Sequence, residues 1–223
     1  MSSNKEKSLR PLILTGFAAF NGHAENPSQT LALEFDGQII NNKAIVQSLV
    51  LPVSFEHCFQ ELARELEDLL REKGTTPHSI ICLGLNSGAH KFEIEKVALN
   101  FQHTQIADNE GQLPKAQKVR QTGPDAYFSS LPVEKIVAEL NLRDSAANEF
   151  RHNPYELSLS AGSYVCNTLY YRVLDYLKQS CERFPQTHGV FCHVPKRKGN
   201  GGTFAQTTQG QNKLLKDLLE KVC

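Results

Sequence analysis

The chain has 223 residues, and its 24 Lys and Arg residues balance 24 Asp and Glu residues, so its formal net charge at pH 7 is zero. This balance argues against a nucleic-acid-binding protein, which is expected to carry a basic excess. No apolar run approaches the roughly 20 residues that a membrane span requires. At 40% hydrophobic and 22% charged residues, the composition is typical of a soluble globular protein.

The N-terminal sequence and the cysteines bear on domain organisation and compartment. The first residues are charged and lack the apolar core of a signal peptide, so we expect a cytoplasmic protein. The six cysteines are too scattered for a disulfide framework, and the sequence lacks the CxxC pair that would indicate a structural zinc site. We expect residues 1–8 to form a flexible tail and residues 9–223 to form a single α/β domain.

The first part of the chain predicts alternating strands and helices. Residues 11–15 form a short apolar run that is typical of a buried strand. Asn26 followed by a proline predicts a helix that ends near residue 33. A strand at 44–53 precedes an amphipathic helix that begins at Ser54 and ends at Gly74.

The second part of the chain continues this alternation. In chain order we expect a buried strand at 79–85, an extended segment at 94–101, a polar loop at 102–123 and a helix at 132–142. A strand at 156–160, a helix at 164–177, a strand at 188–194 and a closing helix at 211–222 follow. Strands separated by helix-length segments imply parallel crossovers with helices on both faces of a sheet. The sequence therefore predicts a single-domain, three-layer α/β/α fold with a mostly parallel twisted sheet.

Cys166 is the cysteine best placed to react. It follows the predicted strand 156–160 and a turn of small residues, and it opens the predicted helix 164–177. The free N–H groups and the dipole of a helix start stabilise a thiolate and can hold an oxyanion. A cysteine in this position can equally be a small buried apolar residue, so position alone leaves both interpretations open. Cys82 and Cys192 lie in predicted strands, and we expect them to be buried and inert.

A cysteine nucleophile needs a base, usually a histidine. His193 lies near the end of the predicted strand 188–194, and parallel strands present their carboxyl ends at one edge of a sheet. Alternation along the strand places Phe191 and His193 on one face and Cys192 on the other. A histidine at a strand end is also commonly structural, so His193 is a candidate base.

The segment 159–171, LSAGSYVCNTLYY, resembles the nucleophile segment of pyroglutamyl peptidase type I, also called pyrrolidone-carboxylate peptidase. Four further segments agree in the order of that family, and the strand that ends His193-Val194-Pro195 closes the match. The four segments are TGFAAF together with NPS; LPV; EKVALN, which leads to IADNEG; and GPDAYFSSLP. The resemblance covers nearly the whole chain after Ser8.

This resemblance implies a cysteine peptidase that removes an N-terminal pyroglutamate from peptides and needs no metal or organic cofactor. By matching motif, Cys166 would be the nucleophile, His193 the base and Glu95 the carboxylate that orients the base. The same matching places six residues around the pyroglutamyl ring: Phe17, Phe20, Asn26, Ile106, Tyr164 and Val165. Without the resemblance, core packing would explain the aromatic residues equally well. Relatives in this family often form tetramers, so a homo-oligomer is also implied.

Two alternatives remain open. The chain departs from the family in its first loop, 18–22, and it has Ala89 and Gln105 where arginine is common. These departures favour a family member that binds lactam-ended peptides without cleaving them, although all three triad residue types are present. A nucleoside- or phosphate-binding α/β enzyme would need a glycine-rich anion-binding turn, and the sequence has none.

Overall fold

The computed structural model describes residues 9–22, 25–146, 153–198 and 201–223, so the predicted tail at 1–8 lies outside the described residues. Within these ranges, seven strands form the main sheet. In order across the sheet they are β2 (Ile39–Ile40), β3 (Ala44–Leu51), β1 (Arg10–Phe17), β4 (Ser79–Asn86), β9 (His188–Pro195), β5 (Phe92–Glu95) and β8 (Tyr155–Ser158).

The four central strands of this sheet, β3, β1, β4 and β9, run parallel to one another. At one edge, β2 pairs antiparallel with β3. On the other side, β5 runs antiparallel to β9, and β8 runs parallel to β5. The sheet is therefore mixed and mostly parallel, as predicted, and the two strands beyond β9 run against the central four.

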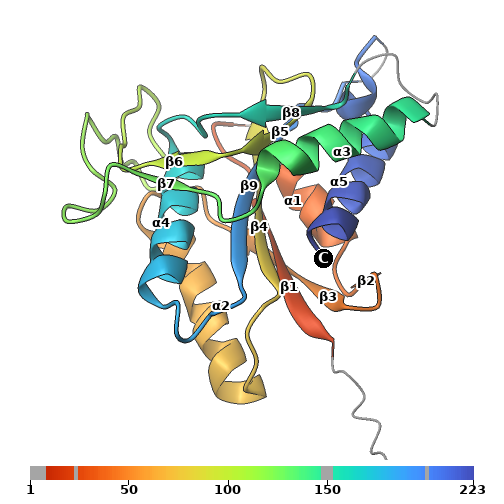
Figure 1. Ribbon diagram of the computed structural model, residues 1–223. Coiled ribbons are helices and arrows are strands. Elements are labelled where there is room, and N and C mark those ends of the chain that lie inside the picture. The colour runs from red at the N-terminus through yellow and green to blue at the C-terminus, as the bar shows by residue number, and fades with distance from the viewer. Residues whose placement is uncertain (1–8, 23–24, 147–152, 199–200) are drawn as a thin grey trace, which may run out of the picture.

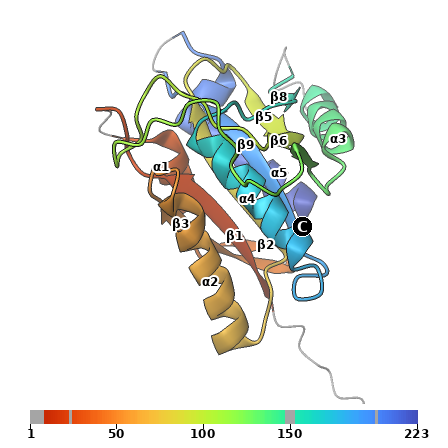
Figure 2. The same ribbon diagram turned by 90° about the vertical axis from the view of Figure 1, so that its left-hand side faces the viewer.

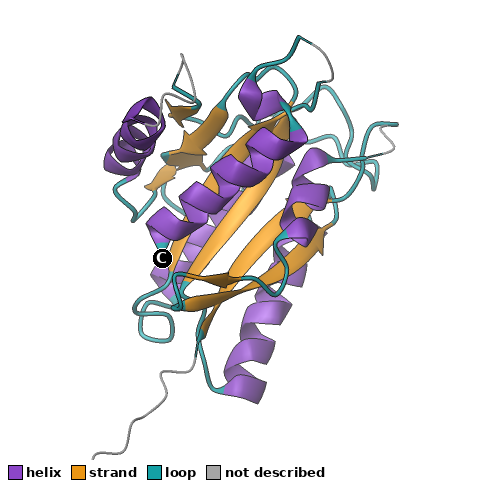
Figure 3. Ribbon diagram, turned by 90° about the vertical axis from the view of Figure 1, so that its right-hand side faces the viewer, coloured by secondary structure: helices purple, strands orange, loops and turns teal. Residues whose placement is uncertain are grey.

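Five α-helices among the described residues cover the two faces of the sheet. They are α1 (Pro27–Glu34), α2 (His57–Lys73), α3 (Val133–Ala146), α4 (Val165–Gln179) and α5 (Thr208–Val222). Helices α2 and α4 cover one face, which Figure 2 turns toward the viewer, and α1, α3 and α5 cover the other (Figures 1 and 3). The predicted three-layer α/β/α architecture is confirmed.

Each face of the sheet has its own apolar core. Alternate residues of β9 divide between the two cores: Val190, Cys192 and Val194 pack with α1, α3 and α5, whereas Phe191 packs with α2 and α4. This is the alternation that the sequence predicts for a strand buried on both faces. Because His193 lies two residues after Phe191, its side chain leaves the sheet on the α4 side.

The helix ends follow the capping signals in the sequence. The side chain of Asn26 accepts a hydrogen bond from Ser28 N, and proline occupies the first helical position of α1. Helix α2 ends at Gly74, whose φ of 58° is in the left-handed region that glycine tolerates best. Helix α2 begins at His57, later than predicted, because the Ser54 hydroxyl accepts hydrogen bonds from the backbone of Glu56 and His57.

Several local features differ from the sequence-based prediction. The extended segment predicted at 94–101 is divided at Lys96 between β5 and a separate ribbon, in which β6 (Val97–Leu99) pairs with β7 (Ala126–Phe128). The strand β7, the short strand β2 and the 3-10 turn η1 (Phe204–Gln206) were not predicted. Among the described residues, no helix combines the length and apolar character needed to cross a membrane.

Candidate active site

Cys166 is the second residue of α4, and its side chain is partly exposed. The next residue, Asn167, is fully buried and fixes this end of the helix against β6. Its Oδ1 accepts a hydrogen bond from Leu99 N at 2.9 Å, and its Nδ2 donates to the carbonyl oxygens of Leu99 and Phe101, each at 2.9 Å. Because both ends of the amide are used, the first turn of α4 has a defined position relative to the sheet.

His193 and Glu95 meet on the α4 side of the sheet. His193 Nδ1 donates a hydrogen bond to Glu95 Oε1 at 2.7 Å, and the imidazole lies beside the Cys166 side chain. The antiparallel pairing of β5 with β9 places Glu95 opposite Phe191, so its side chain points to the same face as His193. The structure thus brings together the three residues predicted as a triad.

The surroundings of His193 favour its charged form. Burial of His193, which is 8% exposed, opposes protonation, but the interactions with the neighbouring Cys166 and Glu95 side chains outweigh this cost and raise its pKa to about 10. Glu95 is fully buried, and its Oε2 has no hydrogen-bond partner among the described residues. The electrostatic attraction of this carboxylate for the imidazolium is strong because little water screens it.

The sulfur of Cys166 approaches the sheet closely at Gly84. A Cβ atom at position 84 would lie 2.9 Å from Cys166 Sγ and 2.7 Å from Cζ of Phe191. Any larger residue at position 84 would therefore displace the thiol or the Phe191 ring. Glycine at position 84 lets the thiol lie close against β4, beside His193.

Three other cysteines are shielded from this chemistry. Cys58, Cys82 and Cys192 are fully buried, which confirms the predicted burial of Cys82 and Cys192. Burial raises the pKa of all three thiols, to about 12 for Cys82. A thiol whose pKa is raised by burial is a poor nucleophile at neutral pH.

The strand that precedes Cys166 runs in an unexpected direction. The sequence suggests that Cys166 follows the carboxyl end of a parallel strand, but β8 runs opposite to β9 because it pairs parallel with the reversed strand β5. The segment 159–164 carries the chain from β8 to the first turn of α4. There, Cys166 lies beside Leu85 and His193, near the carboxyl ends of β4 and β9.

Two hollows meet at Cys166. The smaller one, called the slot here, is narrow and mostly apolar and is lined by Phe17, Phe20, Asn26, Val53, Leu85, Tyr164, Val165 and Cys166. The larger one, called the groove here, has a volume of about 390 Å³ and is mostly polar. The groove is lined by Leu85, Asn86, Ser87, Glu93, Glu95, Ser158, Ser160, Ala161, Gly162, Ser163, Tyr164, Cys166 and His193.

Five of the six residues predicted around the substrate ring line the slot: Phe17, Phe20, Asn26, Tyr164 and Val165. Ile106 lines neither hollow, and its side chain is 49% exposed on the loop 102–123. Val53 and Leu85, which were not predicted, also line the slot and lie just after β3 and within β4. Their positions near the ends of predicted parallel strands were the available signal.

Contacts with residues outside the slot hold its walls in place. Asn26 Nδ2 donates to the carbonyl of Ala18 at 3.1 Å, so the amide fixes the first loop. The Tyr164 ring packs edge-on against Phe55 at a centroid distance of 5.2 Å, and its hydroxyl donates to the carbonyl of Ala107 at 3.0 Å. The last contact ties the loop that carries Ile106 to the mouth of the slot.

The side chains near His193 also offer donors for a metal ion. One donor atom from each of Glu93, Glu95 and His193 lies within 4.8 Å of the others. However, His193 Nδ1 and Glu95 Oε1 already share a hydrogen bond, and the neighbouring thiol supplies a nucleophile without a metal. This arrangement favours nucleophilic chemistry by the thiol.

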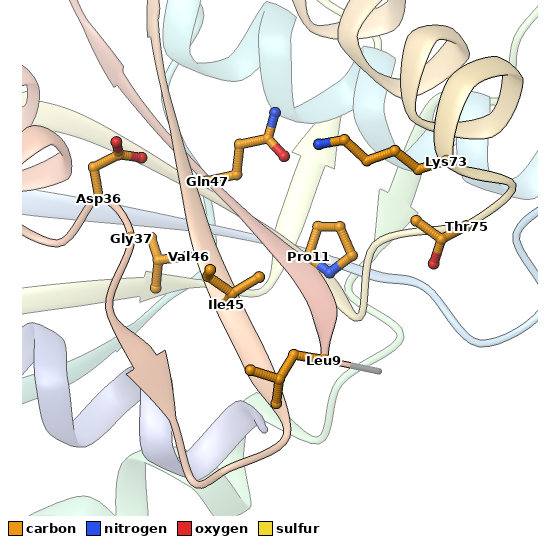
Figure 4. A pocket seen from close by; sticks show the side chains of 9 residues that line it. All are labelled: Leu9, Pro11, Asp36, Gly37, Ile45, Val46, Gln47, Lys73 and Thr75. Carbon is orange, nitrogen blue, oxygen red and sulfur yellow. The ribbon is translucent and has the colours of Figure 1, made fainter. Parts of the chain in front are cut away.

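A further hollow of about 450 Å³ lies elsewhere on the molecule. Figure 4 shows its side chains, which come from the beginnings of β1 and β3, from the turn after α1 and from the end of α2. Its apolar part is formed by Leu9, Pro11, Ile45 and Val46, and its charged residues are Asp36 and Lys73. It lies at the amino ends of the parallel strands, away from Cys166, and no cysteine or histidine lines it.

Comparison with known proteins identifies the family. The family model for pyroglutamyl peptidase matches residues 10–198 of this chain. The pyrrolidone-carboxylate peptidase of Halalkalibacterium halodurans is 36% identical over 189 residues, which is 84% of this chain and 84% of that protein. The chain belongs to the pyroglutamyl peptidase family.

Other members of the pyroglutamyl peptidase family agree in sequence and in fold. The pyrrolidone-carboxylate peptidase of Thermococcus litoralis is 35% identical over 187 residues, covering 84% of this chain and 77% of its own. The crystal structure of pyroglutamyl peptidase I from Bacillus amyloliquefaciens matches with a TM-score of 0.80 at 28% identity, over 96% of this chain and 95% of that one. The resemblance stated from the sequence is confirmed.

Proposed function

We infer that this chain is a cysteine peptidase that removes an N-terminal pyroglutamyl residue from peptides. Family membership supports this activity. The observation that carries it is the grouping of Cys166 with the hydrogen-bonded pair His193–Glu95 between a narrow apolar slot and a polar groove. A partly exposed thiol beside a charged imidazole is the arrangement that nucleophilic catalysis by cysteine requires.

The slot is suited to the pyroglutamyl ring. Pyroglutamate is a neutral five-membered lactam without a free amine, so a site for it needs apolar walls rather than a carboxylate that would anchor an ammonium group. The walls formed by Phe17, Phe20, Tyr164 and Val165 meet this need. We propose that these residues hold the ring and that Asn26 acts mainly by fixing the loop that carries Phe20.

The proposed acylation step uses the whole triad. His193 holds the proton of Cys166, and Glu95 orients the imidazole and stabilises its positive charge. The thiolate attacks the carbonyl carbon of the pyroglutamyl bond, and N–H groups in the first turn of α4 stabilise the oxyanion. His193 then transfers its proton to the departing amine, and a thioester remains on Cys166.

Deacylation reverses these roles. The neutral imidazole of His193 takes a proton from water as the oxygen of that water attacks the thioester carbonyl carbon. Collapse of the second tetrahedral intermediate releases pyroglutamate and restores the thiolate–imidazolium pair. Every proton transfer in this sequence uses His193, so the reaction needs neither a metal nor an organic cofactor.

Two further features are proposals that rest on this function. We propose that the enzyme works in the cytoplasm, where a reactive thiol such as Cys166 stays reduced. We also propose that it forms a homo-oligomer, a tetramer by the resemblance stated from the sequence. Size-exclusion chromatography with light scattering measures the assembly directly.

The function is tested by comparing two fluorogenic amides that differ at one position of the ring. We expect the wild-type protein to hydrolyse the aminomethylcoumarin amide of pyroglutamate and to leave the corresponding prolyl amide uncleaved. The prolyl ring has a charged amine and lacks the lactam carbonyl, so burying it in the apolar slot is costly. Tight binding of pyroglutamyl amides without release of coumarin would instead support the non-catalytic alternative.

A further inference from the structure

The groove holds a second carboxylate that the proposed mechanism does not use. Glu93 lies on β5, directly opposite His193 of β9 in the antiparallel register. Its carboxylate lies within 4.8 Å of the nearest donor atoms of Glu95 and His193. Asn86 Nδ2 donates a hydrogen bond to Glu93 Oε2 at 2.8 Å, which fixes the carboxylate at the groove wall. The side chain is partly exposed, so it can contact a bound molecule.

The proposed function determines which part of the substrate lies in the groove. If the pyroglutamyl ring occupies the slot, its carbonyl carbon lies at Cys166, where the two hollows meet. The departing amine must then face His193, which protonates it. Because His193 lines the groove and does not line the slot, the residue after pyroglutamate leaves through the groove.

The charge of the groove does not depend on where the catalytic proton lies. Cys166 and His193 are neutral as a pair, whether the proton is on sulfur or on the imidazole. The two remaining charged groups are the carboxylates of Glu93 and Glu95, and none of the described residues that line the groove is Lys or Arg. The nearby Lys91 forms an ion pair with Glu156 on β8, and neither residue lines the groove. The groove therefore carries a net negative charge.

We propose that Glu93 is a specificity-determining residue that favours substrates with a cationic side chain directly after pyroglutamate. This inference rests on the proposed function. Glu93 is the carboxylate suited to this role, because Glu95 is fully buried against the imidazole whereas Glu93 is partly exposed. A Lys or Arg side chain in the groove would gain an ion pair with Glu93, and an acidic side chain would be repelled.

The test compares three dipeptide amides that share the same bond to be broken: pyroglutamyl-Arg-amide, pyroglutamyl-Gln-amide and pyroglutamyl-Glu-amide. Chromatography of the released amino-acid amide gives kcat/KM for each. We expect the wild-type protein to prefer Arg over Glu by about tenfold or more at low salt, since the substrates differ by two charges near a partly exposed carboxylate. In Glu93→Gln, which retains an acceptor for Asn86, we expect this ratio to fall close to one.

Glu156→Gln is the matched control, because Glu156 is an exposed carboxylate on the adjacent strand and should leave the ratio as in the wild type. The ratio of rates isolates specificity, since any change in the pKa of His193 affects all three substrates alike. In the wild type, 1 M salt should shrink the preference, because the screening length falls to about 3 Å.

The outcomes separate this inference from the proposed function. Equal cleavage of the three amides by the wild type would overturn the role of Glu93 and leave the peptidase assignment intact. A preference for Arg that persists in Glu93→Gln, or that 1 M salt does not reduce, would likewise overturn it. Failure to cleave any of the three would contradict the proposed function itself.

Discussion

Replacing Cys166 by alanine is expected to lower kcat/KM for a pyroglutamyl amide by about 10⁴-fold or more, the scale seen when a triad nucleophile is removed. The triad forms a covalent bond to the substrate only through this sulfur, so no neighbouring side chain can replace it. The folded state should be little affected, because the side chain is partly exposed and loses one heavy atom. The measurement is initial-rate hydrolysis of the aminomethylcoumarin amide, with thermal unfolding recorded in parallel.

Cys181→Ala is the matched control for this experiment. Cys181 is an exposed cysteine that lies just beyond the end of α4, and it lines neither the slot nor the groove. We expect Cys181→Ala to retain wild-type kcat/KM. Substantial turnover by the Cys166→Ala protein would mean that another group attacks the substrate.

Replacing Glu95 by glutamine is expected to lower kcat by about 10²–10⁴-fold, the usual contribution of a positioned acid–base group. Glutamine retains an oxygen that can accept from His193 Nδ1, but it removes the negative charge that helps to keep the imidazole protonated. The pKa of His193, raised to about 10 in the wild type, should therefore fall in the variant.

The pH profile shows the direction of this effect. Acylation needs imidazolium to protonate the departing amine, so wild-type kcat/KM should decline only as the pH rises through the raised pKa of His193, near 10. In Glu95→Gln the decline should begin at lower pH. A merely structural role for Glu95 would lower activity without moving this alkaline limb. Partial recovery of activity in Glu95→Asp would show that the charge matters.

Local signals in the sequence predicted most of the fold. The capping amide of Asn26 and the terminal glycine at position 74 predicted ends of α1 and α2 that the structure confirms. Apolar runs located the central strands because strands buried on both faces need continuous apolar sequence. The short strands β2 and β7 were missed, since two or three residues carry too little pattern.

The site was harder to predict because it depends on the pairing of strands distant in sequence. Glu95 was located only through the family resemblance, since its burial follows from the antiparallel contact of β5 with β9. The same contact places Glu93 opposite His193, and nothing local in the sequence signals it. The reversed direction of β8 could not be predicted from the sequence either, because it depends on which strand β8 pairs with in the sheet. By contrast, the predicted helix start is a local signal that indicated Cys166 as a candidate nucleophile.

A rapid-quench experiment with an activated substrate tests the central claim most directly. With a pyroglutamyl p-nitrophenyl ester, acylation should outpace hydrolysis of the thioester, so one pyroglutamyl group per chain should accumulate. Acid quenching followed by peptide mass mapping locates that group. The account predicts a thioester on the peptide that contains Cys166, with no such adduct in Cys166→Ala. A pyroglutamyl adduct on any other residue, or a burst of nitrophenol in Cys166→Ala, would contradict it.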